Sequence, residues 1–244
     1  MNDSVITSKN NNIIKETAKL KIKKYRLNSQ LFLVEGFHLV NEAYENKVLK
    51  SVFYLDENPF DDIKGYKVTD EVIKTLSDLM VPQGIIGVCE ITNNSNIGEK
   101  VLLLDNVQDP GNIGTLIRSC VAFGFSTIIS ENSVDYYNEK VVRSTQGALF
   151  KVNLLNGSLS DFIKESKDYD FYVTDLKSDF TLEETEFKNN KLGIILGNEG
   201  QGVRQELIDL VDQSFKIKMK NMESLNVGVA GSIIMYEIFK RSKR

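Results

Sequence analysis

The sequence predicts an α/β protein whose C-terminal part is built on a parallel sheet. From Val101 onward, short apolar runs such as "VLLLD" (101–105) alternate with segments of helical periodicity. Strands that are buried on both faces and separated by helical crossovers are typical of parallel sheets. The composition, 244 residues of which 41% are hydrophobic and 26% charged, is that of an ordinary globular protein. Ligands of such sheets bind at the carboxyl ends of the strands, so we expect the functional residues there.

The residues before this sheet predict a smaller α/β unit. Their apolar patterns indicate, in chain order, helix 13–26, strand 31–34, helix 37–46, strand 51–55, helix 70–79 and strand 84–91. The stretch "TNNSNIGEK" (92–100) is the most linker-like part of the chain. We therefore expect two domains, at 1–94 and 95–244.

In the C-terminal domain, strands and helices are expected to alternate to the end of the chain. The strands are predicted at 101–105, 126–130, 149–155, 170–176, 191–197 and 214–219. The helices are predicted after Asn112, which suits an N-cap, and at 139–145, 159–167, 203–211 and the C-terminus. The residues expected at strand ends are Asn106, Thr174, Gly197 and Met219.

Composition and charge argue against several classes of function. No run is apolar enough for a membrane span and no apolar leader is present, so we expect a cytoplasmic protein. The net charge of −4 argues against general electrostatic attraction to nucleic acid. Cys89 and Cys120 lie in apolar runs without metal-ligand spacing, so we expect core thiols and no metal site. His38, the single histidine, is expected on the surface of a short helix.

Basic residues cluster near the N-terminus. Residues 15–26 include six Lys or Arg side chains and one acid, Glu16. Four of the basic residues follow one another at helical spacing, so a continuous helix would carry them as one stripe. Such a stripe is either a solvated helix face or a surface for nucleic-acid phosphates, and spacing alone leaves both open. The expected RNA contacts are Lys15, Lys19, Lys23 and Arg26 of this stripe, together with Arg143.

A glycine-rich stretch, "ILGNEGQGV" (195–203), follows an apolar strand. Its G-x-x-G-x-G spacing reverses the dinucleotide fingerprint, and no Lys-Ser/Thr pair follows as in a Walker-type phosphate loop. A nicotinamide or nucleotide enzyme is therefore disfavoured. The glycines indicate either a tight turn or a close approach of backbone to a ligand, and both interpretations stay open on this stretch alone.

Three stretches together resemble the three motifs of the SpoU/TrmH branch of the SPOUT RNA methyltransferases. The first is "DNVQDPGNIGTLIRSCVAFG" (105–124), with Asn112 and Arg118, the second contains "LGNEGQG", and the third contains "SLNVGVA". The stretch "LFLVEGFHLVNEA" (31–43) is similar to the N-terminal substrate-binding domain of the rRNA 2'-O-ribose methyltransferases of this family. The resemblance covers nearly the whole chain.

This resemblance implies a ribosomal-protein-like N-terminal domain and a catalytic domain with a deep trefoil knot around S-adenosylmethionine. The glycine backbone would then hydrogen-bond adenine and ribose groups. The implied cofactor contacts are Thr174, Leu176, Leu196, Gly197, Asn198, Glu199, Gly200, Ile217, Met219, Leu225 and Asn226. The sequence departs from the family pattern at Lys218, where a proline is common, and at Gly228, where a serine is more usual.

The reaction implied is methylation of a ribose 2'-hydroxyl, most readily in rRNA. The implied catalytic residues are Arg118, Asn112, Glu199, Ser224 and Asn226. For Glu199 a second interpretation stays open, that of an acceptor that only orients the loop. The family assignment gives Arg118 the hydroxyl proton, but a guanidinium holds its own proton too firmly to be a good base. We favour a role for Arg118 as a phosphate clamp and oxyanion stabiliser, with the proton leaving through water or a phosphate oxygen. A tRNA substrate, or an idle RNA-binding module of the same fold, remains the alternative.

Family resemblance also implies a homodimer, in which the C-terminal helix and the helix after Asn112 cross their symmetry mates. Whether Arg118 serves the cofactor of its own or of the neighbouring subunit stays open. Small residues recur along one side of the C-terminal helix and predict a close approach of another backbone. Packing against the chain's own sheet accounts for them equally well. This strip consists of Ser224, Gly228, Gly231, Ser232 and Met235.

Overall fold

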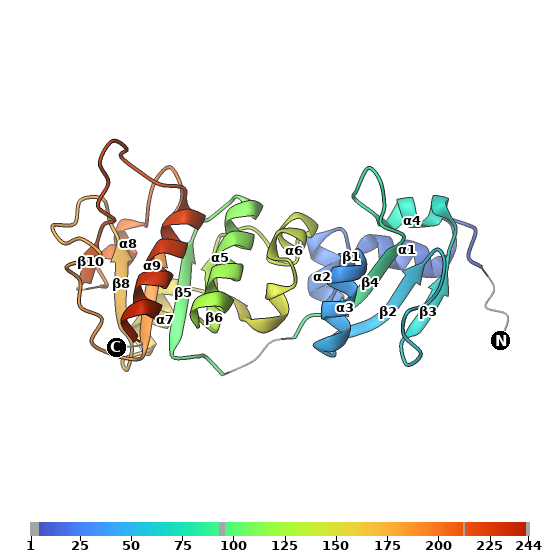
Figure 1. Ribbon diagram of the computed structural model, residues 1–244, viewed down its shortest axis with the longest axis horizontal. Helices are drawn as coiled ribbons and strands as arrows, with labels where there is room; N and C mark the ends of the chain where they lie inside the picture. The colour runs from blue at the N-terminus through green and yellow to red at the C-terminus, as the bar shows by residue number, and fades with distance from the viewer. Residues whose placement is uncertain (1–4, 93–95, 212, 243–244) are drawn as a thin grey trace. The chain divides into compact units, whose positions relative to one another are not determined.

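The computed structural model describes residues 5–92, 96–211 and 213–242. These residues form two compact units (Figure 1). The first comprises residues up to 92 together with 137–150, and the second comprises the remainder. The domain boundary predicted between 94 and 95 falls at a stretch outside the described residues. The assignment of 137–150 to the first unit had no counterpart among the sequence patterns.

The first unit contains a four-stranded sheet. In spatial order its strands are β1 (Leu31–Glu35), β4 (Ile85–Glu90), β2 (Leu49–Tyr54) and β3 (Lys64–Lys67). β4 is antiparallel to β1 and β2, whereas β3 runs parallel to β2. β3 was not predicted, because its sequence "KGYK" has too little apolar character to stand out.

A hydrophobic core lies on one face of this sheet. α1 (Asn12–Lys19) contributes Ile14 and α4 (Asp70–Leu76) contributes Val72, and both side chains are fully buried. Phe53 of β2 joins the same cluster. The third helix, α3 (Phe37–Glu45), also packs against strands β1, β2 and β4.

The single helix predicted over 13–26 is wrong, because the chain turns between α1 and a second helix, α2 (Lys23–Ser29). α1 packs on α4 whereas α2 packs on β1, and one straight helix would not reach both. Arg26 is 4% exposed, and its Nη1 donates a hydrogen bond of 2.7 Å to the carbonyl of Leu20. Carbonyls at a helix C-terminus lack partners within the helix, and Arg26 supplies one. Arg26 is therefore a structural residue rather than part of an exposed stripe.

The segment 137–150 packs on the first sheet through α6 (Glu139–Thr145), which contacts β1. The ring of Phe32 lies 4.7 Å from the ring of Tyr137 and 6.3 Å from that of Phe150, measured between centroids. These apolar contacts anchor both ends of the segment to the first unit.

The second unit is built on a six-stranded sheet in which all neighbouring strands are parallel. In spatial order the strands are β10 (Gln213–Phe215), β8 (Asp170–Thr174), β9 (Leu192–Leu196), β5 (Lys100–Asp105), β6 (Thr127–Glu131) and β7 (Asn153–Asn156). The predicted parallel α/β class is thereby confirmed. The trefoil knot that the resemblance implies stays a prediction.

Four strands of this sheet, β7, β8, β9 and β10, are shorter than predicted, and β7 and β10 differ most. Residues Ala148–Lys151, at the start of the strand predicted over 149–155, form a 3₁₀ turn. β10 ends at Phe215, so Met219 does not mark a strand end. Beyond Phe215 the chain is held to the 175–182 segment by only a single bridge, between Lys216 and Thr181.

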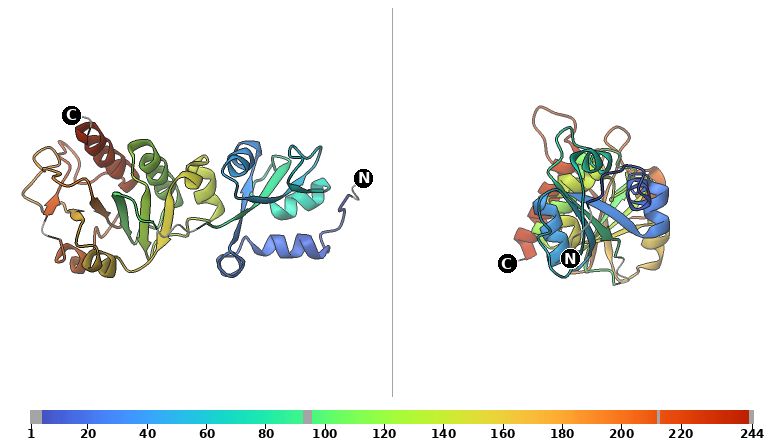
Figure 2. Two further views of the ribbon diagram at one scale, coloured as in Figure 1. Left: turned by 90° about the horizontal axis from the view of Figure 1, so that it is seen from below. Right: turned by 90° about the vertical axis from the view of Figure 1, so that its right-hand side faces the viewer.

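Helices cover both faces of the second sheet (Figure 2). On one face α5 (Pro110–Phe123) and α9 (Val227–Ser242) pack side by side. On the other face α7 (Leu159–Glu165) and α8 (Gln205–Ile208) close a core that includes Ile195 of the central strand β9. The helix predicted over 203–211 is thus present but shorter.

The small residues of α9 pack against α5 of the same chain. A methyl group added at Gly231 would lie 2.4 Å from Leu116 and 2.7 Å from Leu196, and one added at Gly228 would lie 3.2 Å from Thr115. The further contacts to α5 are Ser232 with Ser119 and Met235 with Cys120. The helical part of the predicted intersubunit strip is therefore an internal interface, and the prediction that it faces a second subunit is wrong.

Two features expected from composition can be placed in the structure. Cys89 and Cys120 are fully buried, and burial raises the pKa of both thiols. His38 is exposed on α3, with its Nε2 3.2 Å from the carbonyl of Gln146. Among the described residues, no helix is long and apolar enough to span a membrane, and no cluster of His, Cys, Asp and Glu is suited to a metal ion.

Replacing Arg26 tests its structural role. Arg26→Ala is expected to lower the free energy of unfolding by about 1.5–3 kcal/mol, because the carbonyl of Leu20 loses a charged donor. Lys23→Ala, at an exposed position of the same helix, is expected to change it by less than about 0.5 kcal/mol. Urea denaturation followed by circular dichroism measures both values. Equal stabilities of the two variants would contradict the buried cap.

Candidate functional site

The carboxyl ends of the central strands meet at one edge of the second sheet. The strand register pairs Leu104 with Leu196, Asp105 with Glu131, and Thr174 with Phe215. Thr174 Oγ1 also donates a hydrogen bond of 3.1 Å to the carbonyl of Ile195 on the neighbouring strand. The loops that leave these strands therefore start side by side, as the sequence predicts for a parallel sheet.

The glycine-rich stretch after β9 folds into a closed loop. The backbone N–H of Asn198 bonds to the carbonyl of Gly202 at 3.0 Å, and the reverse bond measures 2.9 Å. The side chain of Asn198 accepts hydrogen bonds from the N–H groups of Gly200 and Gln201. Its Nδ2 donates to the carbonyl of Asn106, which ties the loop to the end of β5. Gly202 adopts a φ of +72°, which favours glycine.

Gly197 is required by this loop itself. A Cβ at this position would lie 2.1 Å from the carbonyl carbon of Gly202 and 2.2 Å from the nitrogen of Val203. No side chain fits there, because both neighbours are backbone atoms of the returning loop. Of the two interpretations left open by the sequence, the tight turn explains Gly197.

Glu199 lies at the tip of the loop, and its carboxylate begins a chain of hydrogen bonds. Asn112 Nδ2 donates to Glu199 Oε1 at 2.8 Å, and Asn226 Nδ2 donates to Asn112 Oδ1 at 2.8 Å. Asn226 Oδ1 in turn accepts from the N–H of Val229 in the first turn of α9. A carboxylate only accepts, so Glu199 fixes the orientation of the Asn112 amide and, through it, that of Asn226. Three of the predicted catalytic residues are thus brought together.

The sequence suggested Asn112 as the N-cap of α5, but the structure shows that the N-cap is Asp109. Asp109 Oδ1 accepts a hydrogen bond of 2.8 Å from the N–H of Asn112, and Pro110 occupies the first helical turn. An aspartate directly before such a proline is a recognised start signal for a helix, so the sequence contained this information. Because Asp109 caps the helix, the buried side chain of Asn112 is free to bridge Glu199 and Asn226.

A second cluster at the same edge was missed in the sequence. Arg204, just after the glycine loop, donates from its backbone N–H and its Nε to the two carboxylate oxygens of the fully buried Asp105, at 2.8 and 2.7 Å. Its Nη2 donates to Glu131 at 2.7 Å. Burial alone would lower the pKa of Arg204, but the bond to Glu131 and the charge of Asp105 outweigh it and raise that pKa. The sequence feature that could have revealed this cluster was Asp105, an aspartate at the end of an apolar strand.

Two predicted catalytic residues stand apart from these clusters. Arg118 is exposed on α5, about 9 Å further along the helix than Asn112 and about 120° around it. Within the described residues Arg118 makes no hydrogen bond or ion pair. The hydroxyl of exposed Ser224 likewise has no partner in that part of the chain. The structure thus does not bring Arg118 or Ser224 to Glu199.

The stretch 217–225 has the properties expected of a segment that holds adenosine. Within the described part of the chain, none of its backbone N–H or C=O groups pairs with another backbone group. Leu176 and Leu225 are 59% and 37% exposed, whereas Leu196 is 1% exposed and packs beneath Gly231. Free backbone groups suit a base edge or ribose hydroxyl, and exposed apolar side chains suit a base face. The residues present therefore fit S-adenosylmethionine.

The loop geometry predicts different effects on stability when two of its glycines are replaced by alanine. Gly197→Ala is expected to lower the free energy of unfolding by about 1–3 kcal/mol, because the added methyl overlaps backbone. Gly200→Ala is the matched control, since the nearest atom to its added methyl, Asn198 Oδ1, is 3.5 Å away. Thermal unfolding and limited proteolysis of the loop measure the difference. A Gly197→Ala protein as stable and protease-resistant as the control would rule out this loop closure.

The sequence matches two described families. Residues 99–236 match the SpoU rRNA Methylase family, and residues 11–87 match the MRM3-like substrate binding domain. Among curated relatives, the 23S rRNA (guanosine(2553)-2'-O)-methyltransferase RlmP of Bacillus subtilis is 33% identical over 96% of this chain and 98% of its own length. The human mitochondrial rRNA methyltransferase 3 is 32% identical over 56% of this chain and 37% of its own.

Solved structures agree with this assignment. The crystal structure of an rRNA methyltransferase from Sinorhizobium meliloti superimposes with a TM-score of 0.87 and 27% identity, covering 98% of both chains. A crystal structure of AdoMet-bound rRNA methyltransferase from that organism gives a TM-score of 0.86 over the same shares. With the family match covering more than half of the residues, the chain belongs to the SpoU rRNA methylase family.

Proposed function

We propose that this chain methylates a ribose 2'-hydroxyl of 23S rRNA, using S-adenosylmethionine. The observation that carries the proposal is the hydrogen-bonded chain of Glu199, Asn112 and Asn226 at the carboxyl edge of the sheet. The Bacillus subtilis relative, whose name specifies guanosine 2553 of 23S rRNA, matches both units of this chain. A tRNA substrate is less favoured, because the first unit matches a domain type described for an rRNA methyltransferase.

S-adenosylmethionine, when bound, supplies the electrophilic methyl group. The chain's own residues then have to hold the cofactor, orient the ribose and let the hydroxyl proton leave. We assign the backbone of 217–225 and the glycine loop to holding adenosine. The remaining proposed contacts are Thr174, Leu176, Ile217, Met219 and Leu225. The side chain of Leu196, also predicted as a contact, is buried beneath Gly231 and is not assigned to the cofactor. Glu199 and Asn226 orient polar groups of the reactants, because their own directions are fixed through Asn112.

Arg118 is assigned to the RNA rather than to the proton. Its guanidinium stays protonated at neutral pH and offers a planar pair of donors to a phosphate or a developing oxyanion. Its exposure and lack of partners in the described part of the chain are consistent with a role that begins when RNA or a second subunit is present.

The second subunit is proposed on a surface different from the predicted strip. α9 exposes Val229, Ile233 and Tyr236, which are 46%, 40% and 51% exposed and follow at i, i+4 and i+7. Apolar side chains on one helical face favour packing against the same face of a symmetry mate. α9 and α5 are adjacent, so a partner seated on this face comes close to the helix that carries Arg118.

The catalytic assignment predicts a split between binding and turnover. Arg118→Lys keeps the charge and loses the planar pair of donors, so methyl transfer to a 23S rRNA fragment should fall about 10²–10³-fold. Affinity for S-adenosylhomocysteine, measured by calorimetry, should stay unchanged. Near-normal turnover of Arg118→Lys would show that a positive charge at this position is sufficient for methyl transfer. If the wild-type protein binds the cofactor but methylates no RNA, the alternative of a catalytically idle RNA-binding module is supported.

The dimer assignment predicts that Ile233→Asp dissociates the protein. Sedimentation velocity should show a dimer for the wild type and a monomer for this variant, because a charge replaces an apolar contact at the interface. Leu27→Asp is the matched control, since Leu27 is 51% exposed on a helix of the first unit. A monomeric and fully active wild type would contradict the assignment.

Mixed dimers test which subunit Arg118 serves. Arg118→Ala and Glu199→Gln chains, each inactive alone, are co-expressed at equal levels. If Arg118 acts across the interface, every heterodimer holds one complete site and random pairing restores about a quarter of wild-type activity. Activity no higher than that of the parent variants would assign Arg118 to its own subunit's site.

A further inference from the structure

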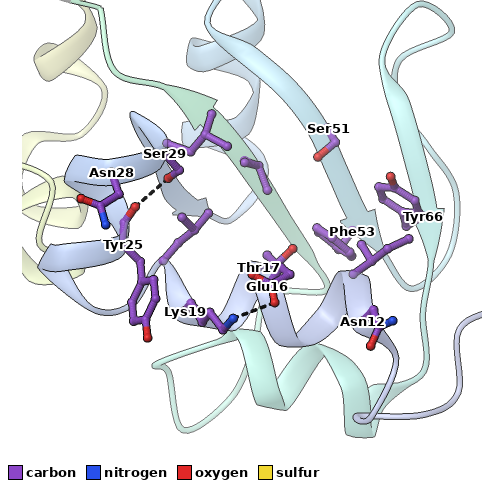
Figure 3. Close-up of a pocket in the computed structure, with 14 residues that line it drawn as sticks. Asn12, Glu16, Thr17, Lys19, Tyr25, Asn28, Ser29, Ser51, Phe53 and Tyr66 are labelled. Carbon is purple, nitrogen blue, oxygen red and sulfur yellow. Dashed lines mark hydrogen bonds and ion pairs between the residues drawn. The ribbon is translucent and has the colours of Figure 1, made fainter.

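A cavity of about 600 Å³ opens in the first unit, outside the site described above (Figure 3). Phe53, Tyr66 and Val88 of the sheet form one side of it, and α1 and α2 form the other. The volume lies within the range of pockets that hold small ligands. It exceeds what one side chain of a docking segment requires.

Tyrosine rings lie on both sides of the cavity. On the sheet side, Tyr66 stacks on the buried ring of Phe53, with centroids 5.0 Å apart and an interplanar angle of 19°, so Tyr66 and not Phe53 is the accessible ring. Across from the sheet, Tyr25 of α2 is 37% exposed. Lys64 lies 5.2 Å from the ring of Tyr66, and Lys19 lies 5.6 Å from that of Tyr25. A flat heterocyclic ring, such as a nucleobase, is the kind of ligand that exposed aromatic rings stack.

Unpaired polar groups line the same cavity. In the described part of the chain, the amides of Asn12 and Asn28 and the hydroxyl of Ser51 have no hydrogen-bond partner. Thr17 is 8% exposed, lines the cavity and has no partner for its hydroxyl there either. A ligand with both donors and acceptors along its edge would pair with these groups.

The helices beside the cavity carry uncompensated positive charge. Lys19 and Lys21 pair with Glu16 and Asp78. Exposed Lys15, Lys23 and Lys24 form no ion pair with any described residue. These lysines suit the phosphates that flank a base.

We propose that this cavity binds one unpaired base of the RNA substrate. The base stacks on the accessible rings of Tyr25 and Tyr66. Its polar edge faces Asn12, Asn28 and Ser51, and the adjoining phosphates contact the exposed lysines. A base within a duplex presents neither its face nor its full edge, so the cavity selects a single-stranded or bulged nucleotide. The inference rests on the proposed function and extends it by naming the part of the RNA that the first unit reads.

The test compares three probes on the full-length protein by fluorescence anisotropy. The probes are a short single-stranded oligoribonucleotide, its duplex, and an oligomer of equal length with abasic internal nucleotides. The wild type is expected to bind the single strand about tenfold more tightly than the other two, because only that probe offers a base to stack. Ser51→Leu, which fills the cavity, and Tyr25→Ala, which removes one ring, should each abolish this preference.

Two control variants separate the base from the phosphates. Tyr44→Ala removes a tyrosine of similar exposure, 36%, that does not line the cavity, and it should keep the preference. Lys23→Ala should lower the affinity for all three probes by the same factor. Melting temperatures identify any variant that is unfolded, and the exposed position of Tyr25 keeps the test available if Ser51→Leu fails to fold.

The outcomes for the cavity and for the enzyme are distinguishable. A preference for bases that survives both cavity variants overturns the proposal, as does equal binding of all three probes by the wild type. Equal binding of all three probes would instead favour a protein partner as the occupant of the cavity. If the wild type discriminates bases and methylates no rRNA, the cavity stands and the proposed function fails. If it methylates rRNA and the cavity variants leave the KM for RNA unchanged, the cavity proposal fails alone.

Discussion

The buried carboxylate of Asp105 is the group on which the arrangement of the site depends. A charge withdrawn from water is tolerated only when it is paired and hydrogen-bonded. Arg204 meets both needs, because its backbone N–H and its Nε reach the two oxygens of Asp105. Arg204 directly follows the glycine loop, so satisfying the buried charge also fixes where the loop ends. The bond from Arg204 to Glu131 extends this constraint to the next strand.

Short hydrogen bonds connect this anchor to the proposed catalytic residues and fix their orientations. Asn198 closes the loop and ties it to Asn106, which leaves Glu199 at the tip. Glu199 orients Asn112, and Asn112 orients Asn226 at the start of the C-terminal helix. Residues far apart in the sequence thereby form one hydrogen-bonded unit. Such positioning is what a transfer reaction requires when its chemistry resides in the cofactor rather than in the protein.

The sequence predicted what periodicity and short motifs encode, namely the parallel sheet, most helices and the three ordered motifs. It did not predict features decided by packing between distant segments. The break after α1 and the burial of Arg26 follow from two different packing partners, which no local pattern states. A glycine indicates that space is needed, but not which atoms need it: at Gly197 they are the loop's own backbone, and at Gly231 they are Leu116 and Leu196. The small residues of α9 were open to two interpretations for the same reason.

The charge distribution bears on how such a chain recognises RNA. With a net charge of −4, the protein as a whole gains little from the release of counterions, which dominates the affinity of strongly basic proteins. Charges in water are screened beyond about 8–10 Å, so the local pattern decides. Pairing of Lys19 and Lys21 with acids leaves Lys15, Lys23 and Lys24 as the unpaired cations of the α1–α2 region among the described residues. With Arg118, these are the proposed phosphate contacts, and so few of them would give limited affinity. The proposed contacts with bases would supply the remainder and would also discriminate one RNA segment from another.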